Sequence, residues 1–376
     1  MLAILALRTA LAHPHLEFAF YKGELYASIP DYYFEDRANH ALYSLMNIAN
    51  MQRDRLDDKC AADDKFNEEI PDVHASIGLG DYLEGAQFHH WRNPKNQAER
   101  IWPCADWSGW TYAWIAPHDQ LVQAFTSSYM SWNQRVPKVY WTGATSQSSM
   151  RRNFERCAAE NPDKFFCDKI DWSRLRENQH IPFAKSENKL KPIIADLRKM
   201  LRYKYVAYFP GNTWSSSLKR IVAAGAVVFL PSVMEYESVT DVILRDCPEC
   251  FLYFEVSDIC GSMAAILNSK TDDELRGYAD RLNRFVKGNL TYSKVMQYAK
   301  NQLIDISRNQ QFPQVTQADA NGISLAGGRR LRKVTCDWIK DSHRKKAPAA
   351  VQWQIDAWFD ENCRIRELPY LAFTAL

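Results

Sequence analysis

The sequence predicts an α/β protein built around a parallel β-sheet with helices on both faces. From Val136 onward, short apolar segments alternate with segments of helical periodicity, which is typical of parallel strands joined by helical crossovers. Gly143 and Gly211 directly follow two of the predicted strands, where the chain turns toward a helix. The chain has 376 residues, of which 46% are hydrophobic, so it can bury the core of two domains of ordinary size.

Apolar runs and helical periodicity predict the elements of this alternating region. Strands are expected at residues 137–142, 204–209, 225–230 and 251–256. Helices are expected at residues 147–160, 187–202, 215–223, 237–245, 258–268, 272–287 and 291–306. Ligands of such folds bind at the carboxyl ends of the strands, where Gly143 and Gly211 fall.

The first 135 residues follow a different pattern. Phe18–Ile29 predicts a hairpin with Tyr21–Glu24 as its turn, Ala38–Met51 predicts a helix, and Val73–Ile77 predicts a short strand. A Trp-rich loop around Trp107 follows, and its prolines exclude both an amphipathic helix and a simple strand.

The two ends of the chain look unlike its middle. Residues 1–15 contain an apolar run that ends at Ala12 and resembles the remnant of a signal or anchor, although Arg8 interrupts it. Residues 307–376 start polar and contain the basic run Arg329–Lys333. We interpret them as a solvated C-terminal extension in preference to a partner-binding segment.

Charge and cysteine content limit the function classes. A net charge of +2 provides no global field that would steer the chain to nucleic acid or an anionic membrane. Nine cysteines suit an oxidising compartment and could form up to four bridges. Cys247-Pro-Glu-Cys250 indicates a local disulfide or two buried thiols, since no second pair completes a zinc site. The sequon Asn289-Leu290-Thr291 also points to the secretory lumen.

The segment after the apolar run Tyr205–Phe209 has the composition of a phosphate-binding loop. Gly211 lets the backbone approach a ligand, and the serines that follow would place amides and hydroxyls at a helix N-terminus. Lys219 adds a positive charge one turn later. The competing interpretation is an ordinary helix cap without a ligand.

Four separated segments, in this order, resemble the family 90 glycosyltransferases, the group of protein O-glucosyltransferases and fungal capsule xylosyltransferases. They are Gly80-Asp81-Tyr82; Asp106-Trp107-Ser108; Tyr140-Trp141-Thr142-Gly143 with Arg151-Arg152; and Gly211 with Trp214, Ser215, Ser217 and Lys219. The resemblance covers roughly residues 16–306 and leaves the C-terminal extension unexplained.

The resemblance implies a GT-B fold, in which two facing Rossmann-like domains enclose the active site in a cleft. Residues 16–135 would form the acceptor-side domain and residues 136–306 the nucleotide-sugar-binding domain. The implied reaction is inverting transfer from UDP-glucose or UDP-xylose to a hydroxyl of a protein or glycan. It needs no metal and no cofactor beyond the UDP-sugar, which is a co-substrate.

The resemblance also implies roles for individual residues. Donor binding falls to Gly143, Arg151, Arg152, Gly211, Trp214, Ser215, Ser217 and Lys219. Without a metal, the cationic side chains and the amides of residues 214–217 would stabilise the departing diphosphate. The residues expected near the sugar or the acceptor are Asp106, Trp107 and Ser108, although Trp107 could instead only brace its loop.

Inverting transfer needs one general base for the acceptor hydroxyl. Asp81 matches the family's aspartate, with Glu84 as the fallback and an ordinary turn aspartate as the competing interpretation. Two positions depart from the family pattern, because Leu83 replaces a proline and Ser217 stands where animal members carry arginine. The alternative function is therefore an inactive family member that binds glycan or protein. Either protein would reside in the lumen of the endoplasmic reticulum or Golgi.

Overall fold

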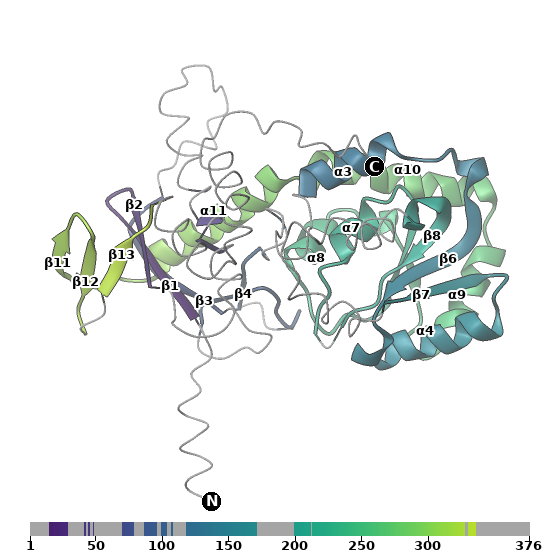
Figure 1. The fold of residues 1–376 in the computed structure, drawn as a ribbon, viewed down its shortest axis with the longest axis horizontal. Coiled ribbons are helices and arrows are strands. Elements are labelled where there is room, and N and C mark those ends of the chain that lie inside the picture. The colour runs from purple at the N-terminus through teal and green to yellow at the C-terminus, as the bar shows by residue number, and fades with distance from the viewer. Residues whose placement is uncertain are drawn as a thin grey trace, which may run out of the picture. The chain divides into compact units, whose positions relative to one another are not determined.

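The computed structural model divides the chain into two units, each with its own β-sheet, and confirms the α/β class (Figure 1). It describes residues 15–28, 41, 42, 44, 45, 48, 70–78, 86–95, 99–103, 107, 118–170, 199–211, 213–327 and 330–335. The first unit holds β1 to β5 with α11 and β11 to β13, and the second holds α3 to α10. No helix in these ranges is long and apolar enough to cross a membrane.

The first unit contains an eight-stranded mixed sheet. Its strands are β1 (His15–Tyr21), β2 (Glu24–Ser28), β3 (Val73–Gly78), β4 (Phe88–His89), β5 (Arg100–Ile101), β11 (Val315–Asp319), β12 (Gly322–Leu325) and β13 (Arg330–Lys333). Their order is β11-β12-β13-β2-β1-β3-β4-β5. The pairs β3–β4 and β4–β5 are parallel and the other pairs are antiparallel. Helix α11 (Tyr292–Asn309) contacts β3.

The predicted hairpin is confirmed as β1 and β2. Lys22 and Gly23 form its two-residue loop with φ of 50° and 74°. Two successive positive φ values are typical of a type I′ turn, whose twist matches that of the paired strands. Gly23 adopts its positive φ without strain because it has no Cβ atom. The strand predicted at Val73–Ile77 is confirmed as β3. Within the predicted helix Ala38–Met51, the described residues are helical.

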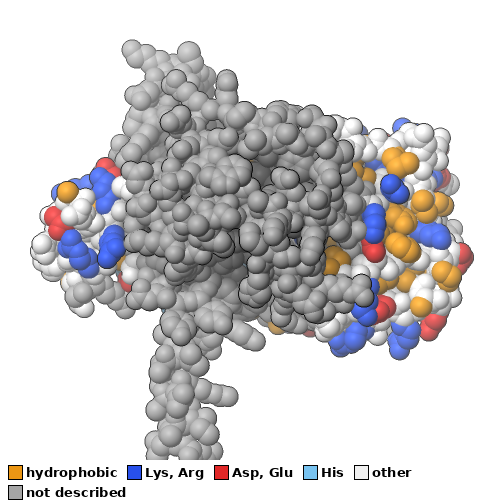
Figure 2. All heavy atoms as spheres, in the orientation of Figure 1, with side chains coloured by type: hydrophobic (Ala, Val, Ile, Leu, Met, Phe, Trp, Pro, Cys, Tyr) orange, Lys and Arg blue, Asp and Glu red, His pale blue; other side chains and the backbone are white. Residues whose placement is uncertain are grey.

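The interpretation of residues 307–376 as a solvated extension is wrong for its described part. Strand β13 pairs with β2, so the predicted basic run becomes an interior strand of the sheet. Leu331 is 0% exposed and packs with Ile323 and Leu325 against Ala19. Arg330 pairs with Asp319 of β11 and Lys333 with Glu24 of the neighbouring β2, and Figure 2 shows both charge types on this region's visible face. The buried side chains of Leu331 in β13 and of Ile323 and Leu325 in β12 make these two strands part of the fold.

The second unit contains a five-stranded parallel sheet. Its strands are β6 (Val136–Gly143), β7 (Phe165–Lys169), β8 (Tyr203–Ala207), β9 (Val227–Pro231) and β10 (Leu252–Phe254). Its helices are α3 (His118–Ser127), α4 (Ser149–Glu160), α7 (Leu218–Val222), α8 (Val239–Leu244), α9 (Ile259–Asn268) and α10 (Asp272–Asn289). The single-turn 3₁₀ helices are η4 (Trp132–Gln134), η5 (Thr145–Gln147), η6 (Met200–Arg202) and η7 (Pro248–Cys250).

The predicted strands and helices of this unit are present, with four differences, the first being helix α3, where the sequence predicted no element. Strand β7 was missed, because its sequence Phe-Phe-Cys-Asp-Lys has only two strongly apolar residues and an irregular burial pattern. The helix predicted at 215–223 is shorter, since α7 spans five residues. Most of the helix predicted at 187–202 lies outside the described residues, and its last three residues form η6.

The core of the second unit is rich in aromatic side chains. All five residues of β9 are buried, as expected for a central parallel strand covered on both faces. Trp141 meets Phe154 and Phe209 edge-on, at ring-centroid distances of 6.3 and 5.6 Å. These contacts join β6, α4 and the segment after β8 directly beneath the carboxyl ends of the strands.

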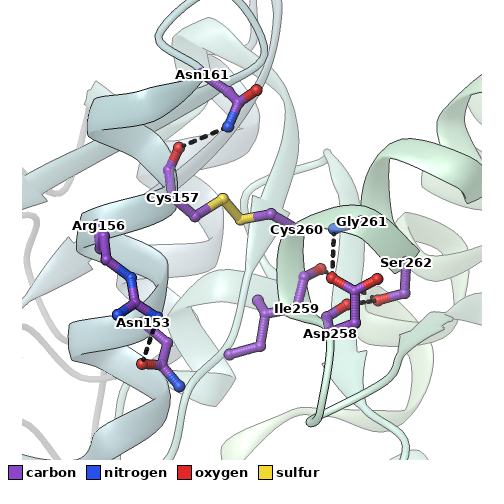
Figure 3. Close-up of a disulfide and its surroundings, with 9 residues drawn as sticks. All are labelled: Asn153, Arg156, Cys157, Asn161, Asp258, Ile259, Cys260, Gly261 and Ser262. Carbon is purple, nitrogen blue, oxygen red and sulfur yellow. Dashed lines mark hydrogen bonds between the residues drawn. A yellow bond between two sulfur atoms is a disulfide. The ribbon is translucent and has the colours of Figure 1, made fainter.

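Two disulfides bind parts of this unit together. Cys157 near the end of α4 pairs with Cys260 in the first turn of α9, and the two helices lie side by side (Figures 1 and 3). Asp258 caps α9 by accepting a hydrogen bond from the Gly261 amide at 3.0 Å. Cys247 pairs with Cys250, which decides the alternative left open above in favour of a local disulfide.

Candidate functional site

The strand order of the parallel sheet creates a point at which the chain reverses direction. The order is β10-β9-β8-β6-β7, so the chain leaves β6 toward β7 on one side and then returns to β8 on the other. Segments that leave the carboxyl ends of β6 and β8 therefore diverge to opposite sides. In open α/β sheets this divergence opens the crevice in which ligands bind.

Arg151, in the first turn of α4, spans this reversal point. Its guanidinium donates hydrogen bonds to the carbonyl of Ala144 at 3.2 Å and to the carbonyl of Phe209 at 3.0 Å. These two carbonyls follow β6 and β8, and the guanidinium lies 5.5 Å from the centre of the Trp141 ring. Arg151 is 6% exposed, and burial lowers the pKa of its guanidinium. Arg151 therefore links the segment after β6 to the segment after β8 from within the protein.

Gly143 ends β6 beside the same Trp141 ring. A Cβ atom at this position would lie 2.6 Å from Cζ2 and 3.0 Å from Cη2 of Trp141. Real Cβ atoms essentially never come this close to another atom, so the ring and a larger residue 143 cannot both keep their places. The glycine is thus explained by packing around Trp141 as well as by the predicted approach of a ligand.

Hydrogen bonds shape the loop between β8 and α7. The hydroxyl of Tyr208 accepts a hydrogen bond from the Ser215 amide at 3.1 Å. The hydroxyls of Ser215 and Ser217 lie 2.9 Å apart, and the Ser217 amide donates to Oγ of Ser215 at 3.4 Å. The predicted donor-binding residues Ser215 and Ser217 are therefore brought together at the start of α7.

The remaining predicted donor residues lie in different environments. Gly211 and Trp214 are half-buried in this loop. Lys219 is 2% exposed, so it is a built-in part of the molecule and not a solvated surface lysine. Arg152 is exposed, and its guanidinium donates to the Ser146 carbonyl at 3.1 Å. The two adjacent arginines thus differ in burial, since Arg151 is buried and Arg152 is exposed.

Two acidic side chains that the sequence analysis did not select follow β9, one just before α8 and one in its first turn. Glu237 is 2% exposed and forms an ion pair with Arg245. Asp241 accepts hydrogen bonds from the amide and the hydroxyl of Ser238, each at 2.7 Å. Burial outweighs these bonds and raises the pKa of Asp241 to about 6. The Ser-x-x-Asp spacing before an apolar run was a signal that could have found this cap.

Of the predicted acceptor-side residues, the structure describes Trp107. Asp81, Glu84, Asp106 and Ser108 lie outside the described residues. Trp107 is described and is 1% exposed. Enclosure of its ring is the arrangement expected of an aromatic side chain that braces its loop.

One group of three side chains in the described ranges has the proximity of metal ligands, namely Cys247, Glu249 and Cys250. Its two sulfur atoms are joined in the disulfide, so they offer no thiolate to a cation. Arg151 and Lys219 are the cations nearest in sequence to the loops at the reversal point. What the arrangement offers a ligand there is amides, hydroxyls and fixed positive charge, the chemistry that suits a phosphorylated substrate.

Comparison with known proteins agrees with this geometry. No curated protein matches the chain. The family model described as glycosyl transferase family 90 matches residues 85–357, which is more than two thirds of the chain. The match contains the whole parallel sheet and also β11 to β13, so it reaches further toward the C-terminus than the predicted resemblance and begins after Asp81. Because a match of this extent covers the reversal point and every loop around it, the chain belongs to glycosyl transferase family 90.

Proposed function

We propose that this glycosyltransferase transfers glucose or xylose from a UDP-sugar to a hydroxyl of a protein or glycan, with inversion at the anomeric carbon. The proposal rests on one observation above all. The reversal of strand order between β6 and β8 lies inside the family match, and Arg151 donates hydrogen bonds to carbonyls that follow both strands. We further propose a GT-B enzyme in which the second unit, with its parallel sheet, is the nucleotide-sugar-binding domain. The sheet of the first unit is mostly antiparallel and so differs from the Rossmann-like acceptor domain that the resemblance implies.

The donor diphosphate would bind beside the loop from Gly211 to Lys219. Amides and hydroxyls of the loop would donate hydrogen bonds to the phosphate oxygens, and Lys219 would supply positive charge from within the protein. The observed α7 is too short for its dipole to contribute much, so the loop itself carries the proposal. Arg152 is exposed and could reach a phosphate, whereas Arg151 would hold the two strand ends that frame the site.

Asp81 is proposed as the general base that takes the proton of the acceptor hydroxyl, with Glu84 as the fallback. Asp106 and Ser108 would line the acceptor side, with the enclosed Trp107 bracing their loop. These roles rest on the family resemblance of their segments, since four of the five residues lie outside the described ranges and Asp81 precedes the family match.

We propose that catalysis needs no divalent metal and that the protein works in the lumen of the endoplasmic reticulum or Golgi. Fixed cations and amides can stabilise a departing diphosphate without reorganisation, which is the role a metal would otherwise play. The disulfides Cys157–Cys260 and Cys247–Cys250 support an oxidising compartment.

The test is release of UDP by the purified chain, supplied separately with UDP-glucose, UDP-xylose and UDP-galactose, with and without EDTA. We expect turnover with glucose or xylose donors that EDTA leaves unchanged. Asp81→Asn should lower kcat by roughly 10²–10⁴-fold, the usual contribution of a general base. Glu84→Gln is the matched variant, and it should retain activity if Asp81 is the base.

Two other outcomes are informative. Loss of activity in Glu84→Gln with retention in Asp81→Asn would transfer the role of base to Glu84. Binding of UDP without turnover, for every donor and acceptor, would favour the alternative of a glycan- or protein-binding family member.

A further inference from the structure

The loop from Gly211 to Ser217, between β8 and α7, is held by hydrogen bonds more than by burial. Each of its described residues is only half-buried, and none reaches the core. A segment with so few buried apolar contacts opens easily unless specific bonds retain it. The bonds that retain it therefore decide where its amides and hydroxyls lie.

We propose that Tyr208 is the positioning residue of this loop, and that its hydroxyl sets the donor-binding arrangement of Ser215 and Ser217. This inference rests on the proposed function. Tyr208 is 0% exposed, so it cannot touch a substrate and can act only through the residues that it holds. Its hydroxyl reaches forward seven residues along the chain to accept the hydrogen bond from the Ser215 amide.

Tyr208 is itself firmly anchored. Its backbone amide donates to the Phe229 carbonyl at 2.9 Å, which extends the pairing of β8 with β9 by one residue. The next carbonyl, that of Phe209, accepts the hydrogen bond from Arg151. The ring therefore projects from backbone fixed on both sides, and its hydroxyl has a defined place.

Further hydrogen bonds connect Ser215, which the Tyr208 hydroxyl holds, to the start of α7. Ser215, held through its amide, bonds through its hydroxyl to both the amide and the hydroxyl of Ser217. Leu218, the first residue of α7, is 1% exposed and follows Ser217 directly. The chain of contacts from Tyr208 through Ser215 to Ser217 links a buried strand end to the buried start of a helix.

This arrangement also divides the amides of the predicted phosphate loop into two kinds. The amides of Ser215 and Ser217 donate within the loop. Among the described residues, no acceptor is found for the amides of Trp214 and Ser216. The amides left for a diphosphate are those flanking Ser215, and the Tyr208 hydroxyl decides how they are presented.

The test compares Tyr208→Phe with Tyr205→Phe. Both tyrosines are buried and come from the same apolar run, but the Tyr205 ring packs edge-on against Trp132 in the core. The readouts are the dissociation constant for UDP, the KM values for donor and acceptor, the melting temperature, and hydrogen exchange of the Ser215 amide.

We expect Tyr208→Phe to weaken UDP binding and raise the donor KM by roughly 3- to 10-fold, the worth of one such hydrogen bond. The acceptor KM should not change, and the melting temperature should fall below that of Tyr205→Phe by only a few degrees, as expected for one lost hydrogen bond. The Ser215 amide should exchange faster in Tyr208→Phe only.

The inference is overturned if Tyr208→Phe binds UDP as Tyr205→Phe does, or if the Ser215 amide exchanges at the same rate in both variants. Equal losses for donor and acceptor would likewise reduce Tyr208 to a general structural role. If the wild-type chain neither binds nor turns over a UDP-sugar, the proposed function fails. Hydrogen exchange still tests the Tyr208 bond in that case, so the two failures are distinguishable.

Discussion

Arg151 shows how one buried side chain can hold the segments after two strands together. A buried guanidinium is costly unless its donors are satisfied, and here two carbonyls at the strand ends accept from it while the Trp141 ring lies nearby. The sequence selected Arg151 and Arg152 together as phosphate ligands. Their burial separates them, because adjacent residues of a helix project about 100° apart.

Gly143→Ala should destabilise the protein by about 1–3 kcal/mol, because the new Cβ overlaps the Trp141 ring at the end of β6. The ring can retreat only into a core that is already filled. The control is Gly288→Ala in α10, where no atom lies within 4 Å of the new Cβ and a gain of up to about 1 kcal/mol is expected. Urea unfolding of both variants measures the contrast, and an equal effect at the two sites would contradict it.

Asp241 should make the protein less stable as the pH rises from about 4 to 7. The pKa of Asp241 in the folded protein is about 6, above the ordinary value of 3.8. Its stabilising contribution is therefore complete below pH 3.8 and is lost as the pH rises through 6. The loss is at most about 3 kcal/mol. Asp241→Asn cannot ionise, and its free energy of unfolding should lack this dependence.

The control for Asp241 is Asp272, whose pKa is lowered by the hydrogen bond from Lys204. Its contribution has the opposite sign, since it is present above the ordinary pKa and is lost as the pH falls. Unfolding of Asp241→Asn and Asp272→Asn over pH 3–7 should therefore diverge from the wild type in opposite directions. Parallel curves would contradict the assignment for Asp241.

Strand β13 shows that pairing can override local composition. Its basic sequence predicts solvent exposure, yet Leu331 and its neighbours on β12 close a small cluster against β1 and β2. The two are compatible because successive side chains of a strand point to opposite faces, so Arg330 and Arg332 are exposed while Leu331 between them is buried.

Leu331→Ala should therefore cost about 2–5 kcal/mol, as for a buried leucine elsewhere in a core. Arg332→Ala is the matched control on the same strand, with an expected change within about 0.5 kcal/mol because Arg332 is exposed. Thermal unfolding distinguishes them. Similar melting temperatures for the two variants would restore the interpretation of this segment as a solvated extension.

For the molecule as a whole, the disulfides constrain the unfolded chain very differently. Cys157 and Cys260 are 103 residues apart in sequence, whereas Cys247 and Cys250 are 3 apart. Loop-closure entropy grows with the length of the closed loop, so the bridge between α4 and α9 should contribute far more. It also holds α4, which carries Arg151 at its other end.

Replacing Cys157 and Cys260 by serine should lower the free energy of unfolding by about 4–5 kcal/mol in the chain-entropy model. Replacing Cys247 and Cys250 should cost about 2 kcal/mol in the same model. Chemical denaturation of both double variants without reductant measures the difference. A reductant should then leave the first variant less affected than the wild type, and an equal loss in the two variants would contradict the argument.

Much of the fold could be predicted from sequence, because its signals are local. A few neighbouring residues are enough to predict the hairpin loop Lys22-Gly23 and the apolar strands β6, β8 and β9. Strand β7 could not be found this way, since it depends on pairing with β6. At the site, Gly211, Ser215 and Ser217 were predictable as a loop, whereas Tyr208 was indistinguishable from the other aromatics of its run.

The sequence by itself determined the α/β class, the position of the Gly143 and Gly211 turns, and the family, because these depend on periodicity and ordered motifs. Only the tertiary structure decided which residues meet. It placed Arg151 between two strand ends, tied Tyr208 to Ser215, joined Cys157 to Cys260 and built β13 into the first sheet. The reason is physical: a side chain's role depends on burial and on partners distant in sequence, and those are settled when strands pair and helices pack.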